Sequence, residues 1–174
     1  MVRQLLTVSR LEAGTLKPRV EVLALGPRVR RAWEALGVAE VPFELEDEAA
    51  GWLALADPDQ LDQVLWAILD NAVKYGGGAP VRALVRPDVA SHVLLLTIAD
   101  SGPGVPEELR AAVFERYARG TSPDHPEGTG IGLYVARELT RAMEGSLDLE
   151  PSGPGQGAAF TMVLPAEASA AGET

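Results

Sequence analysis

The sequence has no cysteine, only two lysines, only two histidines and no long apolar run. Without cysteine the chain can form neither disulfides nor thiolate metal sites, which agrees with a reducing compartment. No stretch approaches the roughly 18 apolar residues of a membrane-spanning helix. The charged N-terminus does not resemble a signal peptide. We therefore expect a cytoplasmic protein that makes no direct contact with a membrane.

Acidic residues outnumber basic residues, 25 to 15, and the formal net charge is −10. This charge disfavours binding to nucleic acid or to anionic lipid. An anionic ligand could still be held locally by a few cations, a helix N-terminus and a divalent ion. A chain of 174 residues with 47% hydrophobic residues fits one globular domain that buries roughly 70% of its unfolded surface.

The most informative stretch runs from Asp57 to Gly78. Asp57 can cap a helix, Pro58 fits the first helical position, and Gln60 stands where a capping box places Glu or Gln. The glycines at 76–78 are expected to end the helix. Apolar residues with three-four spacing predict one buried face: Leu61, Val64, Leu65, Ile68, Leu69, Ala72 and Val73.

A second face of the same helix is polar. Asn71 and Lys74 lie one turn apart and point the same way, and Tyr75 follows at the helix end. An amide, an ammonium group and an aromatic ring could serve the metal, the phosphate and the base of a nucleotide. Exposed Asn and Lys are also common on ordinary solvated surfaces, so the helix alone leaves both interpretations open.

The rest of the chain predicts further helices and strands. Helices are expected at 2–12, 27–36, 106–114 and 132–144, and strands at 41–46, 51–56, 81–86, 92–99, 146–150 and 158–164. The nearly continuous apolar run at 93–98 is typical of a central strand covered by helices. We expect an α+β fold, a two-layer α/β sandwich with a mixed or antiparallel sheet and helices on one face. Residues 166–174 are expected to form a disordered tail.

Two glycine-rich segments carry candidate ligand contacts. Asp100 follows the apolar strand, so its carboxylate could accept a hydrogen bond from an exocyclic amine while Gly102 and Gly104 admit a flat ring. The same residues are equally good turn chemistry. Gly128-Thr129-Gly130-Ile131-Gly132 opens a helix, where backbone amides and the helix dipole suit an anion. Its spacing matches neither the dinucleotide fingerprint nor a Walker loop.

Other candidate side chains are less specific. Arg116 and Arg119 precede a polar segment and could reach a terminal phosphate, although exposed arginines are usually only solvated. His92 and His125 are not placed to form a metal site. The sequence does not favour a hydrolase triad.

Taken in order, these segments resemble the conserved boxes of the sensor histidine kinases. Segments similar to the N, first glycine, F and second glycine boxes are Asp70-Asn71-Ala72-Val73-Lys74-Tyr75, Asp100-Ser101-Gly102-Pro103-Gly104, Val113-Phe114-Glu115-Arg116-Tyr117 and Gly128-Thr129-Gly130-Ile131-Gly132-Leu133. The stretch at 5–14 resembles the end of that family's dimerisation and phosphoacceptor helical hairpin. The resemblance covers residues 5–165, nearly the whole chain.

The resemblance implies a Bergerat-type ATP-binding fold with ATP and Mg²⁺ as cofactors. Asn71 would coordinate Mg²⁺, Lys74 would contact phosphate, Tyr75 would stack near adenine, and Asp100 would bind the adenine amino group. The catalytic set would be Asn71, Lys74 and Arg116. The implied cofactor-binding set is Asn71, Lys74, Tyr75, Asp100, Gly102, Gly104, Gly128, Thr129, Gly130, Ile131, Gly132 and Leu133.

The implied activity is that of a protein-histidine kinase. The γ-phosphate would pass to a histidine on the hairpin of a homodimer, and later to an aspartate in a response-regulator receiver domain. Residues 1–14 would be the end of the hairpin and 15–165 the catalytic domain. Because the family's phosphoacceptor histidine lies upstream of this chain, we expect the chain alone to bind ATP without autophosphorylating.

Ala67 departs from the family pattern, which usually has a second Asn at this position, one turn before Asn71. A methyl group there would weaken catalysis or change how the metal is held. Two alternatives remain: a protein-serine kinase of the anti-sigma type on the same fold, and a non-catalytic nucleotide-binding module. The helical stretch before Gly14 disfavours the first, and Ala67 favours the second.

Overall fold

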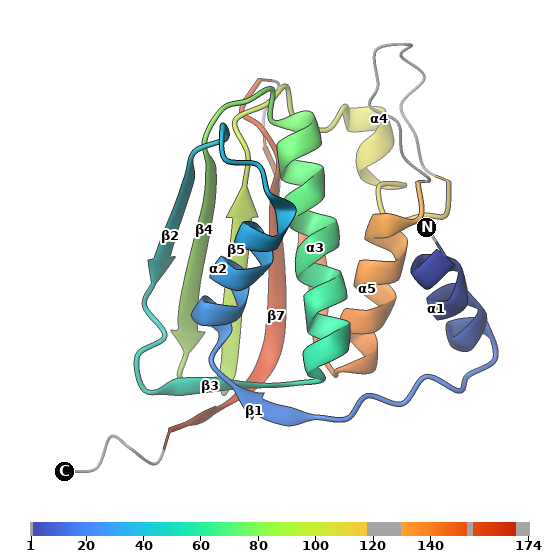
Figure 1. Ribbon diagram of the computed structural model, residues 1–174, viewed down its shortest axis with the longest axis vertical. Coiled ribbons are helices and arrows are strands. Elements are labelled where there is room, and N and C mark those ends of the chain that lie inside the picture. Colours follow the sequence, from blue (N-terminus) through green and yellow to red (C-terminus); the bar gives the residue numbers. More distant parts are fainter. Residues whose placement is uncertain (1, 118–129, 153–154, 170–174) are drawn as a thin grey trace.

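The computed structural model describes residues 2–117, 130–152 and 155–169. Figure 1 shows a twisted sheet with long helices in front of it. The helices are α1 (Val2–Glu12), α2 (Leu25–Leu36), α3 (Pro58–Tyr75), α4 (Glu107–Arg110) and α5 (Gly132–Ala142). The strands are β1 (Glu21–Leu23), β2 (Phe43–Asp47), β3 (Trp52–Ala56), β4 (Val81–Asp88), β5 (Val93–Ala99), β6 (Ser146–Leu149) and β7 (Ala159–Ala168).

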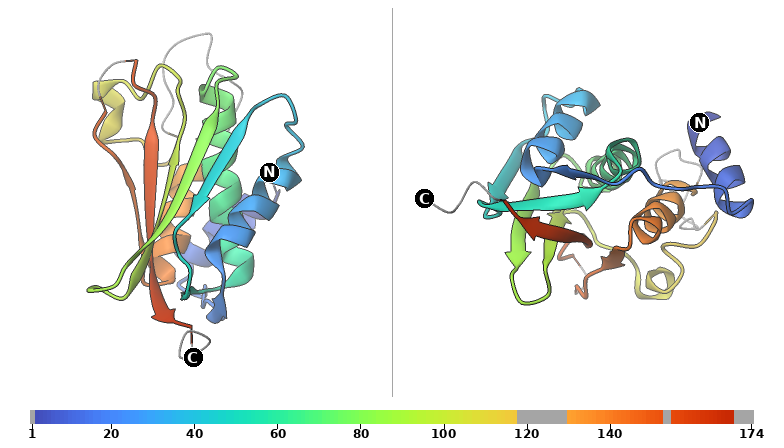
Figure 2. Two further views of the ribbon diagram at one scale, coloured as in Figure 1. Left: turned by 90° about the vertical axis from the view of Figure 1, so that its left-hand side faces the viewer. Right: turned by 90° about the horizontal axis from the view of Figure 1, so that it is seen from below.

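The seven strands that the structure describes form one sheet in the order β1-β3-β7-β5-β4-β2, with β6 also pairing with β7. β2 runs parallel to β4, and the other pairs are antiparallel. Turned by 90°, the molecule shows α2, α3 and α5 on one face of the sheet (Figure 2). The expected two-layer sandwich with a mixed sheet is therefore confirmed.

The centre of the core lies where α3 packs against β5. Leu94, Leu96 and Ile98 are the buried positions of the alternating β5 strand. The face of α3 that the spacing predicted is also buried, at Leu61, Val64, Leu65, Ile68, Leu69 and Ala72. Each large aliphatic side chain buried in this way contributes about 1.5–3 kcal/mol. Since this packing fixes the rotation of α3, its polar face is turned away from the sheet.

Several boundaries differ from those expected from the sequence. β7 continues to Ala168, because residues 166–168 pair with β3 and Ala166 is buried, so the predicted start of a disordered tail at 166 is wrong. Residues 170–174 lie outside the described chain. The helix expected at 106–114 is shorter and spans only Glu107–Arg110. β2 and β3 are consecutive in sequence but lie in different halves of the sheet, which strand patterns alone do not indicate.

Asp57 caps α3 as predicted. Its Oδ1 accepts hydrogen bonds from the backbone N–H groups of Asp59 and Gln60, both at 3.0 Å, and its Oδ2 accepts one from the N–H of Arg19 at 2.7 Å. The reciprocal half of a capping box is not formed. The Asp57 N–H instead donates to the Met143 sulfur at 3.4 Å, while the Gln60 side chain donates to the Asp57 carboxylate at 3.4 Å.

Replacing this cap should destabilise the whole domain. We expect Asp57→Ala to lower the free energy of unfolding by about 1–2 kcal/mol, because two first-turn N–H groups lose their acceptor. Urea denaturation would measure the change. Asp59→Ala is the matched control, since it removes the same charge from the same turn at an exposed side chain. An equal loss in both variants would contradict the capping role.

Candidate nucleotide-binding site

An open groove with a volume of about 1410 Å³ follows the polar face of α3. Its walls come from α1, the segment at 15–19, α3 and α5, together with Val113 and Gly130. Figure 1 shows α3 and α5 next to each other, with α1 beyond α5. The groove brings together six of the predicted site residues: Asn71, Lys74, Tyr75, Gly130, Gly132 and Leu133. Segments separated by more than fifty residues in sequence thus line one cavity.

The polar face of α3 lines this groove as the helical spacing predicted. Ala67, Asn71 and Lys74 all contribute to its wall. Asn71 is half-buried. The Lys74 ammonium group lies 2.5 Å from Oδ2 of Asp70, and the two side chains are 40% and 32% exposed. An ion pair this accessible is worth at most about 1 kcal/mol. A strongly charged ligand could therefore compete with Asp70 for the lysine.

Asp100 lies at the end of β5, beside the C-terminus of α3, and is only 6% exposed. Its Oδ1 accepts hydrogen bonds from the N–H groups of Gly102 at 2.8 Å and Ala158 at 3.3 Å. Its Oδ2 accepts none from the described residues. Burial raises the pKa of Asp100, and the two backbone donors oppose that shift. The carboxylate is therefore held through one oxygen, and the other is left for a ligand.

Gly102 and Gly104 stand where larger residues would not fit. A Cβ at Gly102 would collide with the carbonyl oxygen of Tyr75, so this segment packs directly on the end of α3. Gly104 has a φ of 81°, and a Cβ there would approach the Gly157 carbonyl oxygen to 2.8 Å. Because Gly102 lies against both the Tyr75 carbonyl oxygen and the Asp100 side chain, these two residues are close together. Asp100, Gly102 and Gly104 are not among the residues that line the groove itself.

The second glycine segment is described from Gly130 onward, and Gly128 and Thr129 lie outside the described chain. Gly130 has a φ of 66°, Ile131 is buried as the residue before α5, and Gly132 starts the helix. Ile131 has no side-chain oxygen to cap α5. Helix N-termini of this kind suit an anion. Gly130 and Gly132 present this end of α5 to the groove.

Arg116 lies outside the groove-lining set in this structure. Its guanidinium donates to the Tyr134 hydroxyl at 2.9 Å and to the Glu12 carboxylate of α1 at 2.5 Å. These two bonds raise the pKa of Arg116 above its ordinary value. The predicted contact with a terminal phosphate would require Arg116 to leave these partners. Arg119 and His125 are not described.

Sequence reasoning missed the part of the groove that α1 forms. Leu6, Thr7 and Arg10 line it, and the Thr7 hydroxyl donates to the Gln63 side chain of α3 at 3.1 Å. Helical periodicity predicted α1 but contains no information on what it packs against. His92, which was not assigned a role, is exposed. Its ring packs edge-on against the Trp52 ring, with 5.7 Å between the ring centroids. No cluster of three metal-ligating acids or histidines occurs among the described residues.

The structure combines a mixed sheet, covered on one face by helices, with a groove between α3 and α5. The model of the histidine kinase-, DNA gyrase B- and HSP90-like ATPase family matches residues 56–168. The chain therefore belongs to this family of ATP-binding domains, which confirms the resemblance found in the sequence. No helix in the described residues is long and apolar enough to cross a membrane.

Known proteins extend the comparison. The histidine-protein kinase AfsQ2 of Streptomyces coelicolor is 33% identical over 170 residues, which cover 97% of this chain and 31% of AfsQ2. The structure of the Acinetobacter baumannii histidine kinase AdeS is 26% identical with a TM-score of 0.75, over 94% of this chain and 76% of that chain. The structure of full-length ShkA in complex with AMPPNP shares the fold, with 24% identity and a TM-score of 0.82 over 97% of this chain and 35% of that chain. The chain thus spans about a third of AfsQ2.

The raised pKa of Asp100 makes a prediction for stability. Because the folded state disfavours the charged form, ionisation of Asp100 opposes folding above the raised pKa, and this cost disappears as the pH falls towards the ordinary value of 3.8. Asp100→Asn keeps an oxygen for both N–H donors without the charge. We expect the variant to be more stable than the native chain near pH 7, with a difference that shrinks towards about pH 4.

Urea denaturation across this pH range would measure the difference. Asp88→Asn is a control in which the stability change should have the opposite sign. Hydrogen bonds from Ser91 lower the pKa of Asp88, so that its charge favours the folded state. Its charge therefore contributes stability above pH 3.8 that is lost as the pH falls through the lowered pKa. An Asp100→Asn variant that is less stable than the native chain near pH 7 would contradict the assigned cost of ionisation.

Proposed function

We propose that this domain binds ATP with Mg²⁺ and transfers the γ-phosphate to a histidine on a dimerisation hairpin. The observation that carries the proposal is the single groove that unites Asn71, Lys74 and Tyr75 with the N-terminus of α5. Asp100 adds a buried acceptor beside Tyr75. The order of these segments along the chain also supports it, because the sensor histidine kinases share that order.

The adenine base would be bound by Asp100. Its Oδ1 is occupied by two backbone N–H groups, so Oδ2 is the oxygen that would accept from the exocyclic amine. A guanine base carries a carbonyl oxygen at the corresponding position, which a carboxylate would repel. Tyr75 is 39% exposed and lines the groove, so its ring is accessible for stacking near the base.

The phosphates would lie between α3 and the start of α5. The Asn71 amide oxygen is a hard ligand of the kind Mg²⁺ prefers, and Mg²⁺ commonly keeps several waters and phosphate oxygens beside one or two protein ligands. Ala67 offers no second ligand, so Asn71 would be the only side chain of this helix turn on the metal. In a chain of net charge −10, Mg²⁺ would also neutralise the phosphates.

Phosphoryl transfer needs positioning and charge neutralisation more than covalent help from the protein. A ring nitrogen of the acceptor histidine would attack the γ-phosphorus, and ADP would leave. Lys74, the N-terminus of α5 and Arg116, once released from Glu12, would hold the phosphates. We assign α1 to the end of the hairpin. The catalytic domain runs from residue 15 to the end of β7, three residues beyond the boundary of 165 expected from the sequence. A response-regulator receiver domain in the cytoplasm would accept the phosphoryl group next.

Base recognition can be measured directly. Calorimetric titration should give ATP binding that Mg²⁺ strengthens, and much weaker binding of GTP. Asp100→Asn should cost about 1.5–3 kcal/mol of ATP affinity, roughly tenfold or more, because a charged hydrogen bond is lost. Asp88→Asn removes the same charge from an exposed turn and should leave the affinity unchanged. Equal affinity of native chain and Asp100→Asn for ATP would refute the role of Asp100.

Transfer can be tested with radiolabelled ATP and a separately supplied dimerisation hairpin. We expect acid-labile label on the hairpin, no label on this chain alone, and loss of transfer by about tenfold or more in Asn71→Ala. Ala67→Asn should leave the fold intact and increase Mg²⁺-dependent transfer. Label on His92 or His125 would overturn the expectation for the isolated chain. Acid-stable label on serine would indicate the anti-sigma type of kinase, and ATP binding without transfer a non-catalytic module.

A further inference from the structure

We propose that Arg110 is a positioning residue for base recognition, acting on Asp100 through the two loops that surround it. This inference rests on the proposed binding of adenine by Asp100. The first loop is 100–105, after β5. The second connects β6 to β7 and is described at 150–152 and 155–158. Arg110, the last residue of α4, is the side chain that contacts both loops.

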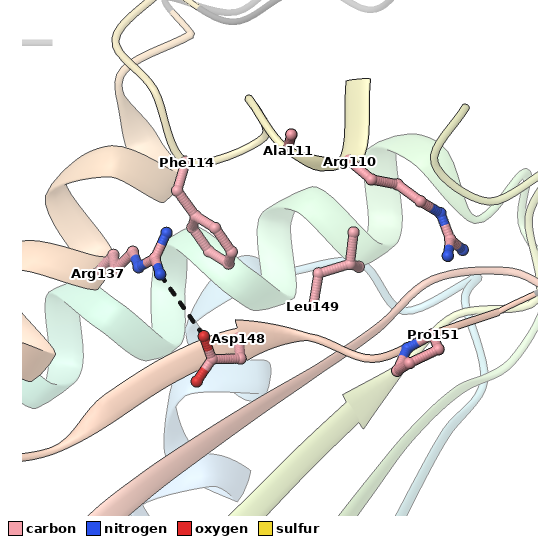
Figure 3. A pocket seen from close by; sticks show the side chains of 7 residues that line it. All are labelled: Arg110, Ala111, Phe114, Arg137, Asp148, Leu149 and Pro151. Carbon is pink, nitrogen blue, oxygen red and sulfur yellow. Dashed lines mark ion pairs between the residues drawn. The ribbon is translucent and has the colours of Figure 1, made fainter. Parts of the chain in front are cut away.

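The contacts of Arg110 use two different nitrogen atoms of its guanidinium group. Nε donates to the carbonyl oxygen of Val105 at 3.2 Å, at the end of the first loop. Nη2 donates to the Ser152 hydroxyl at 2.6 Å and also to the Ser152 carbonyl oxygen. A planar group with several fixed donors can bridge two backbones in this way, whereas a lysine ammonium group cannot reproduce the geometry. Figure 3 shows the guanidinium directed away from Phe114 and Arg137.

The second loop connects Ser152, which Arg110 contacts, to the backbone and carboxylate of Asp100. The Ser152 hydroxyl that Arg110 holds donates to the Gly157 carbonyl oxygen at 3.1 Å. A Cβ at Gly157, whose φ is 74°, would collide with the carbonyl oxygen of Asp100. The next residue, Ala158, donates its N–H to the Asp100 carboxylate at 3.3 Å and accepts from the Asp100 N–H at 2.9 Å.

The first loop is tied to the second independently of Arg110. The Gly155 N–H donates to the Pro103 carbonyl oxygen at 3.2 Å, and Gly104 lies against the Gly157 carbonyl group. The two loops therefore contact each other directly. Arg110 connects both of them to α4, at Val105 of the first loop and Ser152 of the second. Loss of Arg110 should leave the sheet intact but let the Gly157–Ala158 backbone shift, so that Oδ2 of Asp100 no longer meets the base at a fixed position.

The test compares ATP with inosine triphosphate, which has an oxygen in place of the purine 6-amine. For the native chain we expect clear preference for ATP. Arg110→Ala should weaken ATP binding by about tenfold while binding of inosine triphosphate changes little. Ser152→Ala should also reduce the preference for ATP over inosine triphosphate, and it should destabilise the domain less than Arg110→Ala does. Arg110→Lys should not restore it, because one ammonium group cannot make both contacts.

Arg137→Ala is the matched control. Arg137 lines the same pocket as Arg110, but its guanidinium lies over the Phe114 ring at 4.6 Å and pairs with Asp148 at 3.6 Å. We expect this variant to change stability without changing the preference for ATP. In the Asp100→Asn background, Arg110→Ala should cost little further ATP affinity, because both act on one hydrogen bond.

The outcomes separate this inference from the proposed function. No ATP binding by the native chain would defeat the proposed function. ATP binding that depends on Asp100, with an unchanged ratio of ATP to inosine triphosphate affinity in both Arg110→Ala and Ser152→Ala, would defeat the positioning role alone. Additive effects of Arg110→Ala and Asp100→Asn would also overturn it, because they would show that Arg110 acts independently of Asp100.

Discussion

The packing of one helix face on the sheet is the constraint on which the candidate site depends. The aliphatic face of α3 packs against the sheet whose central strand is β5, and the Asp57 cap fixes where the helix begins. Once that face is buried, the helical repeat determines that Ala67, Asn71 and Lys74 line the groove. The position of the polar groups of α3 is thus a consequence of core packing.

The same strand also sets the position of Asp100. β5 lies between β4 and β7, so Asp100, the residue that follows its last residue Ala99, emerges beside the end of α3. A carboxylate at such a point would be costly to bury alone, and the Gly102 and Ala158 N–H groups reduce this cost. The raised pKa shows that the compensation is incomplete. An incoming hydrogen-bond donor would complete it, which is a physical reason for an amine-bearing base to bind here.

Helical and strand periodicity predicted most of the fold, because burial in this molecule follows simple repeats. It placed α3, β4, β5 and α5 to within about two residues, and cap chemistry located Asp57. Periodicity did not predict the order of the strands in the sheet, because a strand pattern does not show which strands pair. The consecutive strands β2 and β3 lie in different halves of the sheet. Contacts between loops, such as Arg110 with Ser152, have no periodic signal. The strand at 166–168 was missed because small residues there resemble a tail until β3 supplies its partner.

The two cations assigned to phosphate are both held by acidic partners in this structure. Lys74 pairs with Asp70, and Arg116 pairs with Glu12 and Tyr134. In a chain of net charge −10, such pairing is the ordinary state of an exposed cation. Solvent screening makes exposed pairs weak, so a bound triphosphate carrying several charges would compete effectively for both cations. Because Glu12 belongs to α1, release of Arg116 to phosphate would also remove one contact that holds α1 against this domain.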